Sequence, residues 1–435
     1  IRLNRTNMKN NKSAWYWIPS LYFAEGLPYV AVMTLSVIMY KRLDISNTDI
    51  ALFTSWLYFP WVIKPLWSPF VDLVKTKRWW ICAMQLLVGA GMAGVAFMLP
   101  CSSFFQMTLF FFWLMAFSSA THDIAADGFY MLGLTQEKQA FFIGIRNTFY
   151  RIAMIAGQGL LVMLAGFLEQ RTGHITAAWY SVFLVLSGLF IGLALWHKYV
   201  LPRPQADQPR HGVDIRTIWQ NFLKTFLSFF QKKGVGLAVC FMLTYRLGES
   251  QLVKLASPFL LDSPDAGGLG LSTGQVGFVY GTVGVTALLA GGIIGGVCMA
   301  KDGLGRWLFP MALAISLPNL VYLYLSYTQS SDFLLVNVCV AIEQLGYGFG
   351  FTGYTMYLMQ FAEGEYKTSH YAICTGFMAL GMMLPGMVSG WVQELIGYRH
   401  FFAWVMLCCV PLFIILPFIL RSLKGQGSTA RPLKG

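Results

Sequence analysis

The sequence LDISNTDIALF at residues 43–53 has a counterpart further along the chain, LGLSTGQVGFVY at residues 269–280. In each stretch a serine precedes an apolar run and is followed three residues later by an acid or an amide. The pairs are Ser46 with Asp49 and Ser272 with Gln275. This is the capping-box pattern, in which side chains satisfy the free backbone amides of a first helical turn. Both stretches therefore predict a helix start, and the two starts lie 226 residues apart.

The composition indicates a membrane protein. Hydrophobic residues make up 56% of the 435 residues and charged residues only 11%, whereas about a quarter of an ordinary soluble domain is charged. A helix needs roughly 20 apolar residues to cross a bilayer. An all-α membrane protein with 12 transmembrane helices is predicted, at residues 14–41, 47–74, 78–99, 104–132, 138–168, 176–198, 235–262, 273–299, 305–326, 332–361, 368–396 and 399–422.

The two halves of the chain match at further places. KRWW (77–80) and GRWL (305–308) begin the third and ninth predicted helices at an offset of 228 residues. Glu25-Gly26 in the first helix falls opposite Gly248-Glu249 in the seventh. Two six-helix halves related by an axis along the membrane normal are the arrangement of the major facilitator transporters. A major facilitator fold with two pseudo-symmetric six-helix halves is therefore expected, with a substrate site between the halves.

The longest connection, residues 199–234, separates a predicted N-terminal bundle (1–198) from a C-terminal bundle (235–435). Within it, apolar residues fall on one helical stripe and basic or polar residues on the opposite face. This is typical of a helix that lies on the cytoplasmic membrane surface, and a plain linker is the alternative. The stripe consists of Ile215, Ile218, Trp219, Phe222, Leu223 and Phe226.

Lysine and arginine are concentrated on one side of the predicted topology. The two tails, the loop between the second and third helices and the 199–234 segment hold most of them. Because short cytoplasmic loops are enriched in these residues, both termini are predicted to be cytoplasmic. This bias accounts for the net charge of +12, so no nucleic-acid partner is expected. The eight cysteines lack paired metal-ligand spacing and are interpreted as packing residues.

Ionisable residues occur inside several predicted spans. Each costs about 3 kcal/mol near the bilayer centre, so each is a candidate for function. The fourth span contains SSATHDIAADGFYM (118–131) and with it two carboxylates. The full set is Glu25, Lys64, Asp123, Asp127, Arg146, Arg151, Arg246, Glu249, Lys254 and Glu343.

The fourth and fifth helices form a predicted hairpin that turns near residues 136–137. Asp127 and Arg146 lie at nearly the same distance from that turn, and so do Asp123 and Arg151. At about 1.5 Å of rise per residue, two acid–base pairs are possible at matching depths. Such pairs would make the carboxylates tolerable in the membrane.

These pairs could serve only to fix helix positions. The functional interpretation adds two roles: Arg and Lys would hold an anionic substrate, and a carboxylate would take up a proton when its basic partner leaves. Exchange of partners would then couple protonation to alternating access. His122 could join a proton relay, although a histidine that is simply hydrogen-bonded is the simpler interpretation.

The stretch SPFVDLVKTKRW (68–79) occupies the place of the superfamily's signature between the second and third helices, which latches the cytoplasmic side. Asp72 corresponds to its acid and Arg78 to one of its bases, so both are gating candidates. Ser68 stands in place of the usual Gly and Leu73 in place of the usual Arg, so the match is partial. Anchoring of the loop on the cytoplasmic side explains the bases equally well.

Several stretches together resemble AmpG-like permeases, which belong to the peptide and acetyl-CoA transporter family within the major facilitator superfamily. They are FAEGLPY (23–29), IKPLWSPFVD (63–72), THDIAADGF (121–129), YRLGES (245–250) and EQLGYGFGFTGY (343–354). His122 stands where the family is expected to have Gln, which leaves the charge pattern intact. By residue, the match extends to Glu25, Lys64, Asp123, Asp127 and Glu343.

This resemblance implies a proton-coupled importer of cell-wall muropeptides, GlcNAc–anhydro-MurNAc with or without peptide, in the inner membrane of a Gram-negative bacterium. It would use the proton gradient without a cofactor, work as a monomer in lipid and bind a small glycan or peptide. Such a substrate offers carboxylates to Arg and Lys and sugar faces to aromatic rings. The aromatic candidates are Trp56, Tyr58, Tyr130 and Tyr354.

Transporters of acetyl-CoA or of a siderophore are alternatives within the same family. The buried charges nearly balance, with five acids and five bases, which favours a cargo less charged than CoA. A drug exporter and a non-transporting receptor are further alternatives, but the first would need unpaired acids and the second an added soluble domain. No nucleophile–base pair, phosphate-binding loop or metal-ligand cluster has a suitable spacing, so neither an enzyme nor a metal site is predicted.

Overall fold

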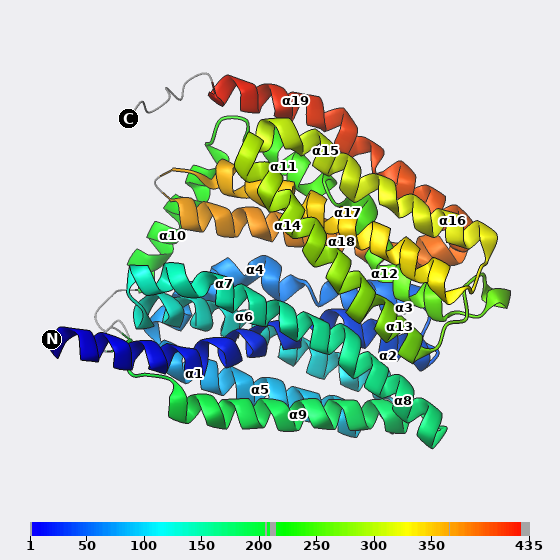
Figure 1. The fold of residues 1–435 in the computed structure, drawn as a ribbon, viewed down its shortest axis with the longest axis horizontal. Coiled ribbons are helices and arrows are strands. Elements are labelled where there is room, and N and C mark those ends of the chain that lie inside the picture. The colour runs from blue at the N-terminus through cyan, green and yellow to red at the C-terminus, as the bar shows by residue number, and fades with distance from the viewer. Residues whose placement is uncertain (1, 205–206, 209–214, 365, 428–435) are drawn as a thin grey trace. The chain divides into compact units, whose positions relative to one another are not determined.

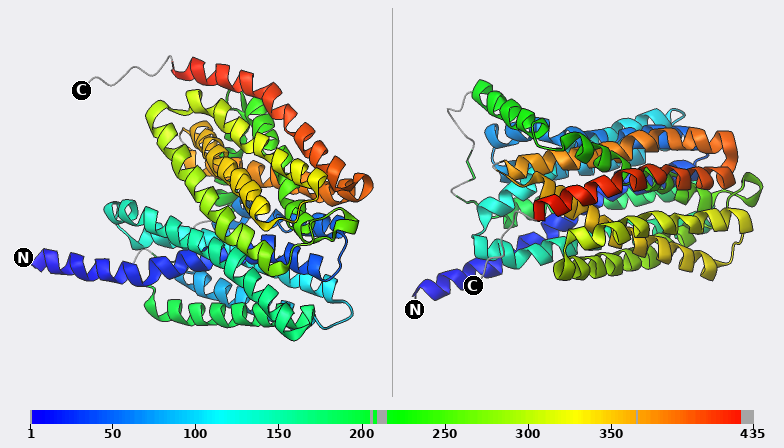
Figure 2. Two further views of the ribbon diagram at one scale, coloured as in Figure 1. Left: turned by 45° about the vertical axis from the view of Figure 1, so that its right-hand side comes forward. Right: turned by 90° about the horizontal axis from the view of Figure 1, so that it is seen from above.

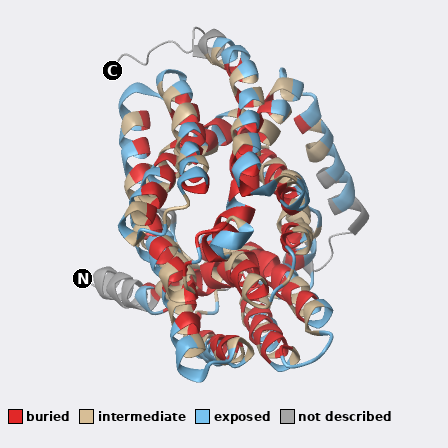
Figure 3. Cartoon of the chain, turned by 90° about the vertical axis from the view of Figure 1, so that its right-hand side faces the viewer, coloured by how far each residue is buried: buried red, intermediate tan, exposed pale blue. Residues whose placement is uncertain are grey.

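The computed structural model describes residues 2–204, 207–208, 215–364 and 366–427. Within these ranges the chain is helical and contains no strand. This is what lipid requires, because a helix satisfies its backbone hydrogen bonds within one segment. The helices gather into two compact units. In each unit, buried residues line the inside of the bundle and exposed residues face outward (Figure 3).

Unit 1 comprises Ile1–Asp44, Ile63–Ile215 and Thr273–Gly281. α5 packs along both α6 and α9 (Figures 1 and 2). The core contains Trp17, Phe129 and Phe142, each at most 1% exposed. The helices are α1 (Arg2–Val30), η1 (Ala31–Leu35), α2 (Ser36–Arg42), most of α4 (Phe59–Leu73), α5 (Lys77–Met98), α6 (Phe104–Gly133), α7 (Gln136–Ile155), η2 (Ala156–Leu161), α8 (Val162–Thr172), α9 (Ile175–Val200) and α13 (Thr273–Phe278).

Unit 2 comprises Ile45–Val62, Arg216–Ser272 and Thr282–Gly435. α17 packs against α14 and α15, and the core contains Phe229, Phe241 and Leu358. The helices are α3 (Asn47–Trp56), most of α10 (Ile215–Phe230), α11 (Val235–Thr244), α12 (Leu247–Leu261), η3 (Pro264–Ala266), α14 (Val285–Asp302), α15 (Leu304–Ser316), η5 (Leu317–Asn319), α16 (Leu320–Thr328), α17 (Phe333–Ala362), α18 (Lys367–Cys408) and α19 (Val410–Gly427); η4 (Val279–Gly284) crosses the boundary between the units.

The predicted fold of 12 membrane helices is confirmed. Nine helices of the described chain are individually long and apolar enough to cross a membrane, and residues 235–261, which follow α10 after a 91° bend, add a tenth. α3 and α4 are short helices that together form the second span. α18 runs through the eleventh span and into the twelfth, with a break at Gly397, whose φ of 72° lies in the left-handed region. This break falls where the sequence predicts the loop between the last two spans.

The outer faces of both units are apolar. Phe110 in unit 1 and Ile293 and Leu334 in unit 2 are 64%, 68% and 72% exposed. Large apolar side chains in such number on the outside of a soluble protein would favour aggregation. Against lipid they carry no such cost, so these faces fit a chain that crosses the membrane many times.

The amphipathic segment is partly described. α10 is a helix, and Trp219, Leu223 and Leu227 are 38%, 49% and 58% exposed along one face. Phe229, on another face, is fully buried in the core of unit 2. The apolar stripe is therefore exposed at Trp219 and Leu223, as a surface-lying helix requires. The side chains of Ile215, Ile218 and Phe222 lie outside the described part.

The two helices with related starts, α3 and α13, each pack in a unit that is built mainly from the other half of the chain. α3 packs against α18 in unit 2, and α13 packs against α8 in unit 1. The N-cap of α3 is confirmed, since Ser46 Oγ accepts from the backbone amide of Asp49 at 3.0 Å. Division into bundles at residues 1–198 and 235–435, joined by 199–234, stays a prediction.

Glycines bring these helix starts close to their neighbours. A Cβ on Gly390 of α18 would lie 1.9 Å from the carbonyl oxygen of Asn47, and one on Gly166 of α8 would lie 2.3 Å from the amide nitrogen of Gly274. Gly166 and Gly390 are 224 positions apart, close to the repeat offset. The internal repeat thus includes the glycines that allow each helix start to pack closely against its neighbour.

A carboxylate holds each helix start at these positions. Thr273 Oγ1 donates to Glu169 Oε2 at 2.7 Å, and Thr48 Oγ1 donates to Glu394 Oε2 at 2.6 Å. The backbone amide of Thr48 donates to the other oxygen of Glu394 at 3.0 Å. Glu169 and Glu394 lie 225 positions apart. We refer to these two arrangements as the Glu169 clasp and the Glu394 clasp.

Gly390→Ala is expected to destabilise the protein by about 1–3 kcal/mol, because the added methyl group overlaps backbone that cannot move aside cheaply. Gly192→Ala on α9 is the matched control, since nothing lies within 4 Å of its added Cβ, and it should be neutral or slightly stabilising. Thermal unfolding in detergent measures both. Equal melting temperatures for the two variants would contradict the close approach of α3 to α18.

Candidate functional site

Both carboxylates of α6 form ion pairs within unit 1. Asp123 Oδ2 lies 3.6 Å from Lys64 Nζ on α4, and Asp127 Oδ1 lies 3.1 Å from Arg146 Nη2 on α7. The side chains are 16% to 44% exposed, so the pairs are neither sealed in the core nor fully solvated. The predicted pairing of Asp127 with Arg146 is present in the structure.

The predicted pairing of Asp123 with Arg151 is not found among the described residues and is corrected here. Asp123 faces Lys64 instead, and Arg151 is exposed. The reason is helical periodicity. Asp123 and Asp127 are four residues apart and share a face, whereas Arg146 and Arg151 are five apart and point roughly 140° away from each other. Asp123 and Arg151 can therefore lie at the same depth along their helices, but their side chains do not point toward each other.

Two tyrosines surround Arg146. Its guanidinium lies 4.5 Å from the ring centroid of Tyr22 and 5.2 Å from that of Tyr130. Tyr22 also donates its hydroxyl to Asp127 Oδ1 at 3.3 Å. Cation–π contacts of this kind stabilise a desolvated cation. Sequence reasoning missed Tyr22, although its position three residues before Glu25 places it on the same face of α1.

Glu25 adds a third carboxylate to this cluster. Its Oε2 atom is buried and has no hydrogen-bond partner in the described structure. The charged groups that act on it are Asp127, Asp123, Arg146 and Lys64. Gly26 allows this approach, because a Cβ there would lie 2.9 Å from the carbonyl oxygen of Tyr150 on α7. The cluster thus holds three carboxylates against two cations.

In unit 2, Arg246 lies at a break in the seventh span. α11 ends at Thr244 and α12 begins at Leu247. Arg246 donates to both oxygens of Glu249, at 2.6 and 3.0 Å, and to the hydroxyl of Tyr347 at 2.9 Å. Its guanidinium lies 5.3 Å from the Tyr347 ring and 5.2 Å from the Phe351 ring. Broken helices near mid-membrane are where transporters place ligand groups.

Two further ionisable side chains of unit 2 are buried without an opposite charge in the described chain. Glu343 is 3% exposed and accepts one hydrogen bond, from Gln344 Nε2 at 2.8 Å. Lys254 is 2% exposed, donates to Thr54 Oγ1 at 3.0 Å, and lies 5.1 Å above the Tyr58 ring. Burial of an ionised group without a partner is costly, so both are functional candidates.

The four aromatic candidates occupy different environments. Tyr130 and Tyr58 lie beside Arg146 and Lys254 respectively. Trp56 is 39% exposed. Tyr354 is fully buried, stacks on Tyr245 at 4.6 Å between ring centroids, and donates to the Met242 carbonyl at 2.6 Å. The structure therefore places Tyr354 in the core of unit 2 rather than at an open surface.

Of the gating candidates, the side chain of Asp72 lies outside the described part. Arg78 donates from Nε to the Leu201 carbonyl at 3.2 Å and from its guanidinium to the Lys198 carbonyl, at the end of α9. Its backbone amide donates to Asp207 at 3.1 Å. Asp207, which the sequence did not single out, thus satisfies free amides at the start of α5. These contacts tie α5 to the end of α9.

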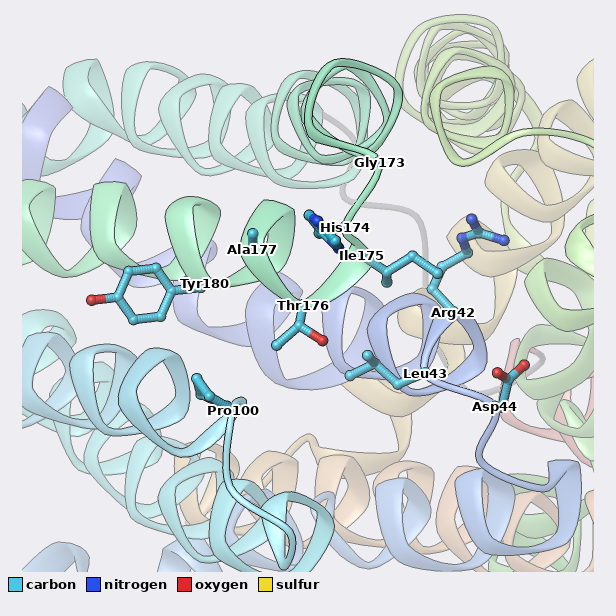
Figure 4. Close-up of a pocket in the computed structure, with 10 residues that line it drawn as sticks. All are labelled: Arg42, Leu43, Asp44, Pro100, Gly173, His174, Ile175, Thr176, Ala177 and Tyr180. Atoms are coloured by element: carbon cyan, nitrogen blue, oxygen red, sulfur yellow. The ribbon is translucent and has the colours of Figure 1, made fainter.

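A hollow of about 690 Å³ opens at one end of unit 1 (Figure 4). Arg42, Asp44 and His174 are among its lining residues. Arg42 lies 3.2 Å from Glu169 and so joins the Glu169 clasp. At 1.5 Å per residue, Asp123 lies about 28 Å along α6 from the nearby start of that helix at Phe104. The hollow is therefore separate from the ion pairs. No metal-binding group of three or more His, Cys, Asp or Glu occurs among the described residues.

Many apolar helices with ion pairs between them define a multi-pass membrane protein. Residues 20–384 match the family described as the Major Facilitator Superfamily. The chain therefore belongs to this superfamily. The prediction that it is a transporter and not an enzyme is confirmed by the same comparison.

Individual relatives narrow the similarity. The Anhydromuropeptide permease of Escherichia coli (strain K12) is 26% identical over 412 residues, which cover 93% of this chain and 79% of the relative. A putative transporter of Rickettsia conorii named AmpG 4 is 24% identical and covers 92% of this chain and 94% of its own length. A solved mutant structure of the nucleoside transporter NupG has a TM-score of 0.72 at 13% identity, over 92% of this chain and 98% of that structure, which supports the fold. The resemblance to AmpG-like permeases is thus confirmed.

Removal of one partner of the Arg246–Glu249 pair should destabilise the protein more than removal of both. Arg246→Met leaves the Glu249 carboxylate buried, since that side chain is 3% exposed, and a loss of about 3–5 kcal/mol is expected. Arg246→Met with Glu249→Leu should recover part of this loss. Chemical denaturation in detergent measures the cycle, and additive losses would contradict a strong pair.

Proposed function

We propose that this chain is a proton-coupled importer that carries muropeptides across the inner membrane of a bacterium by alternating access. The cargo is inferred from the relatives, of which one is named for anhydromuropeptides. These relatives match more than nine-tenths of this chain, so the similarity includes both halves. The positive charge of the tails supports cytoplasmic termini.

The proposal of proton coupling is based on the unequal number of carboxylates and cations in the charged cluster of unit 1. Among the residues that the structure describes, Glu25, Asp123 and Asp127 lie in one cluster with two cations, Lys64 and Arg146. The cluster is electrically balanced when one of the three carboxylates holds a proton. When a cation moves away, a second carboxylate would need one, because an isolated buried carboxylate is unfavourable. Proton binding is therefore tied to which groups are paired.

Arg246 is the group best placed to hold an anionic cargo in unit 2. Glu249, Tyr347 and Phe351 fix its guanidinium. Arg246 donates to Glu249 and Tyr347 from Nε and Nη2, and Nη1 takes no part in these hydrogen bonds. Guanidinium groups recognise carboxylates through strong, directional hydrogen bonds. A muropeptide offers carboxylates, and the rings beside Arg246 offer surfaces for its sugars.

The two clasps support alternating access. Each holds the start of one helix on a unit built mainly from the opposite half of the chain. Release of α13 would not leave Glu169 unpaired, because Arg42 and the Trp179 indole N–H, at 3.2 and 3.0 Å, remain bound to it. Glu394 is exposed, so water can replace Thr48. Neither carboxylate is therefore left without a partner when its clasp opens, and release of α3 also breaks the buried hydrogen bonds from Asn47 Nδ2 to Gln393 Oε1 at 2.6 Å and to the Tyr398 hydroxyl at 2.9 Å.

Proteoliposomes that contain the protein are expected to take up labelled GlcNAc–anhydro-MurNAc faster when a proton gradient is directed inward. Asp123→Asn should reduce uptake to the level without a gradient, because the amide cannot exchange a proton. Asp302→Asn, in the exposed pair with Arg306 at 3.0 Å, is the matched control and should retain wild-type uptake.

The outcomes of this uptake assay separate cargo from mechanism. Uptake that the gradient does not alter would refute proton coupling. If folded wild-type protein takes up none of the labelled cargo, the muropeptide assignment is wrong, and acetyl-CoA and siderophores become the cargoes to test.

Disulfides across the clasps should stop transport reversibly. In a background without the eight native cysteines, Thr48→Cys with Glu394→Cys and Thr273→Cys with Glu169→Cys each place two thiols at a clasp. Oxidation should abolish uptake and reduction should restore it, while the single-cysteine variants stay active in both conditions. Full uptake by a verified cross-linked protein would contradict opening at that clasp.

A further inference from the structure

A chain of buried hydrogen bonds crosses four helices of unit 1, apart from the charged cluster. Ser20 Oγ on α1 lies 2.9 Å from His197 Nε2 on α9. His197 Nδ1 lies 2.8 Å from Gln85 Oε1 on α5, and Gln85 Nε2 lies 2.9 Å from His122 Nε2 on α6. Gln85, His122 and His197 are at most 3% exposed. Proton coupling as proposed above assigns none of these residues a role.

With the Gln85 amide in the orientation that it has in the structure, the donors and acceptors of this chain assign the tautomers of both histidines. The Gln85 amide donates to His122 Nε2, so that nitrogen carries no proton and Nδ1 carries it. Gln85 Oε1 accepts from His197 Nδ1, and His197 Nε2 meets Ser20 Oγ, whose hydroxyl also donates to the Trp17 carbonyl at 3.3 Å. In this arrangement both rings carry a proton on Nδ1, and His122 is neutral. A proton added to His122 Nε2 would face the Gln85 amide N–H and break the chain.

The charged cluster closes this chain into a ring. Ser20 and Tyr22 both lie on α1, and Tyr22 donates to Asp127 on α6 at 3.3 Å. His122 and Asp127 both lie on α6. The connections therefore run from α6 to α5, α9, α1 and back to α6. Such a closed set of directional bonds fixes the rotation of α6 about its own axis more tightly than apolar packing does.

Rotation of α6 decides which residues its carboxylates face. His122 is directed to α5, and the next residue, about 100° further around the helix, is Asp123, which faces Lys64 on α4. Trp67 on the same α4 donates to Thr121 at 3.2 Å. His197 on α9 is the ionisable group that acts on His122, and Cys82 on α5, Lys64 on α4, and Tyr22 and Glu25 on α1 are among the ionisable groups on the other helices around it.

We propose that His122, through Gln85, His197 and Ser20, is a neutral positioning residue that sets the rotation of α6 and thereby the pairing of Asp123 with Lys64 and of Asp127 with Arg146. It accepts a hydrogen bond and does not carry the transported proton. The buried His122 Nδ1 atom has no partner in the described structure, which shows that the ring is held by its Nε2 contact alone. Its use in transport rests on the proton coupling proposed above, whereas the protonation states do not.

Nitrogen-15 NMR of histidine-labelled protein in liposomes tests the protonation states without any cargo. His122 and His197 are expected to remain neutral Nδ1–H forms between about pH 8 and about pH 5, and the signals of exposed His174 and His400 serve as the reference. Gln85→Leu should change the signals of both buried rings and leave those of His174 and His400. Protonation of either buried ring within this pH range, or unchanged signals in Gln85→Leu, would overturn the proposal.

Uptake by two substitutions of His122 tests the positioning role. His122→Gln retains an acceptor for the Gln85 amide and should keep gradient-driven uptake within about twofold of wild type, whereas His122→Leu should lose about tenfold and move the pH of half-maximal uptake. Gly94→Ala, whose Cβ would meet the Phe111 ring, is a control that perturbs packing without touching the ring of hydrogen bonds and should leave that pH in place. Equal losses in the Gln and Leu variants would show that the histidine itself is required and would overturn the proposal. If no variant or wild type takes up cargo, the NMR result still decides the protonation states.

Discussion

An ionised carboxylate costs about 3 kcal/mol at the centre of a bilayer, and α6 carries two of them. Lys64 and Arg146 approach from α4 and α7 to offset that cost, and Tyr22 and Tyr130 cover the guanidinium of Arg146. These contacts require α1, α4 and α7 to lie against α6 at one depth. Gly26 permits the approach of α1 to α7, where a larger residue would overlap Tyr150. The packing of unit 1 thus follows from the need to keep charge on α6.

The internal repeat constrains the chain at the level of individual contacts. The helix starts at Asn47 and Thr273 are separated by the same offset as the capping serines, and a carboxylate and a glycine lie beside each start at nearly the same offset. The two clasps differ in solvation, since Glu169 is bound to Arg42 and Trp179 whereas Glu394 is exposed. A contact that keeps other partners or meets water when it opens can be made and broken repeatedly, as a transport cycle requires.

Periodicity and composition were enough to predict the spans, the N-cap of α3 and the pair of Asp127 with Arg146. They failed where direction matters as well as depth, as at Arg151, which points away from α6. The side chains that complete the sites come from distant segments: Tyr22 from α1, Tyr347 from α17, and Gln85 with His197 from α5 and α9. A single sequence gives no sign of which of many polar residues meet. Tyr354 illustrates the converse, because an aromatic residue near charged ones can simply stack in the core.

The buried ion pairs of the two units differ in whether their partners lie on one helix or on two. This difference indicates which unit is better suited to the proposed proton coupling. In unit 1 the partners sit on separate helices, α4 with α6 and α6 with α7, so a relative movement of helices changes which groups are paired. In unit 2 Arg246 and Glu249 are three residues apart at one helix start, so they stay together when that helix moves as a rigid body. If a carboxylate and its cation stay together, movement of the helix does not change the protonation of that carboxylate. The proposed proton exchange is therefore assigned to unit 1, and the fixed guanidinium of Arg246 is better suited to hold the proposed ligand.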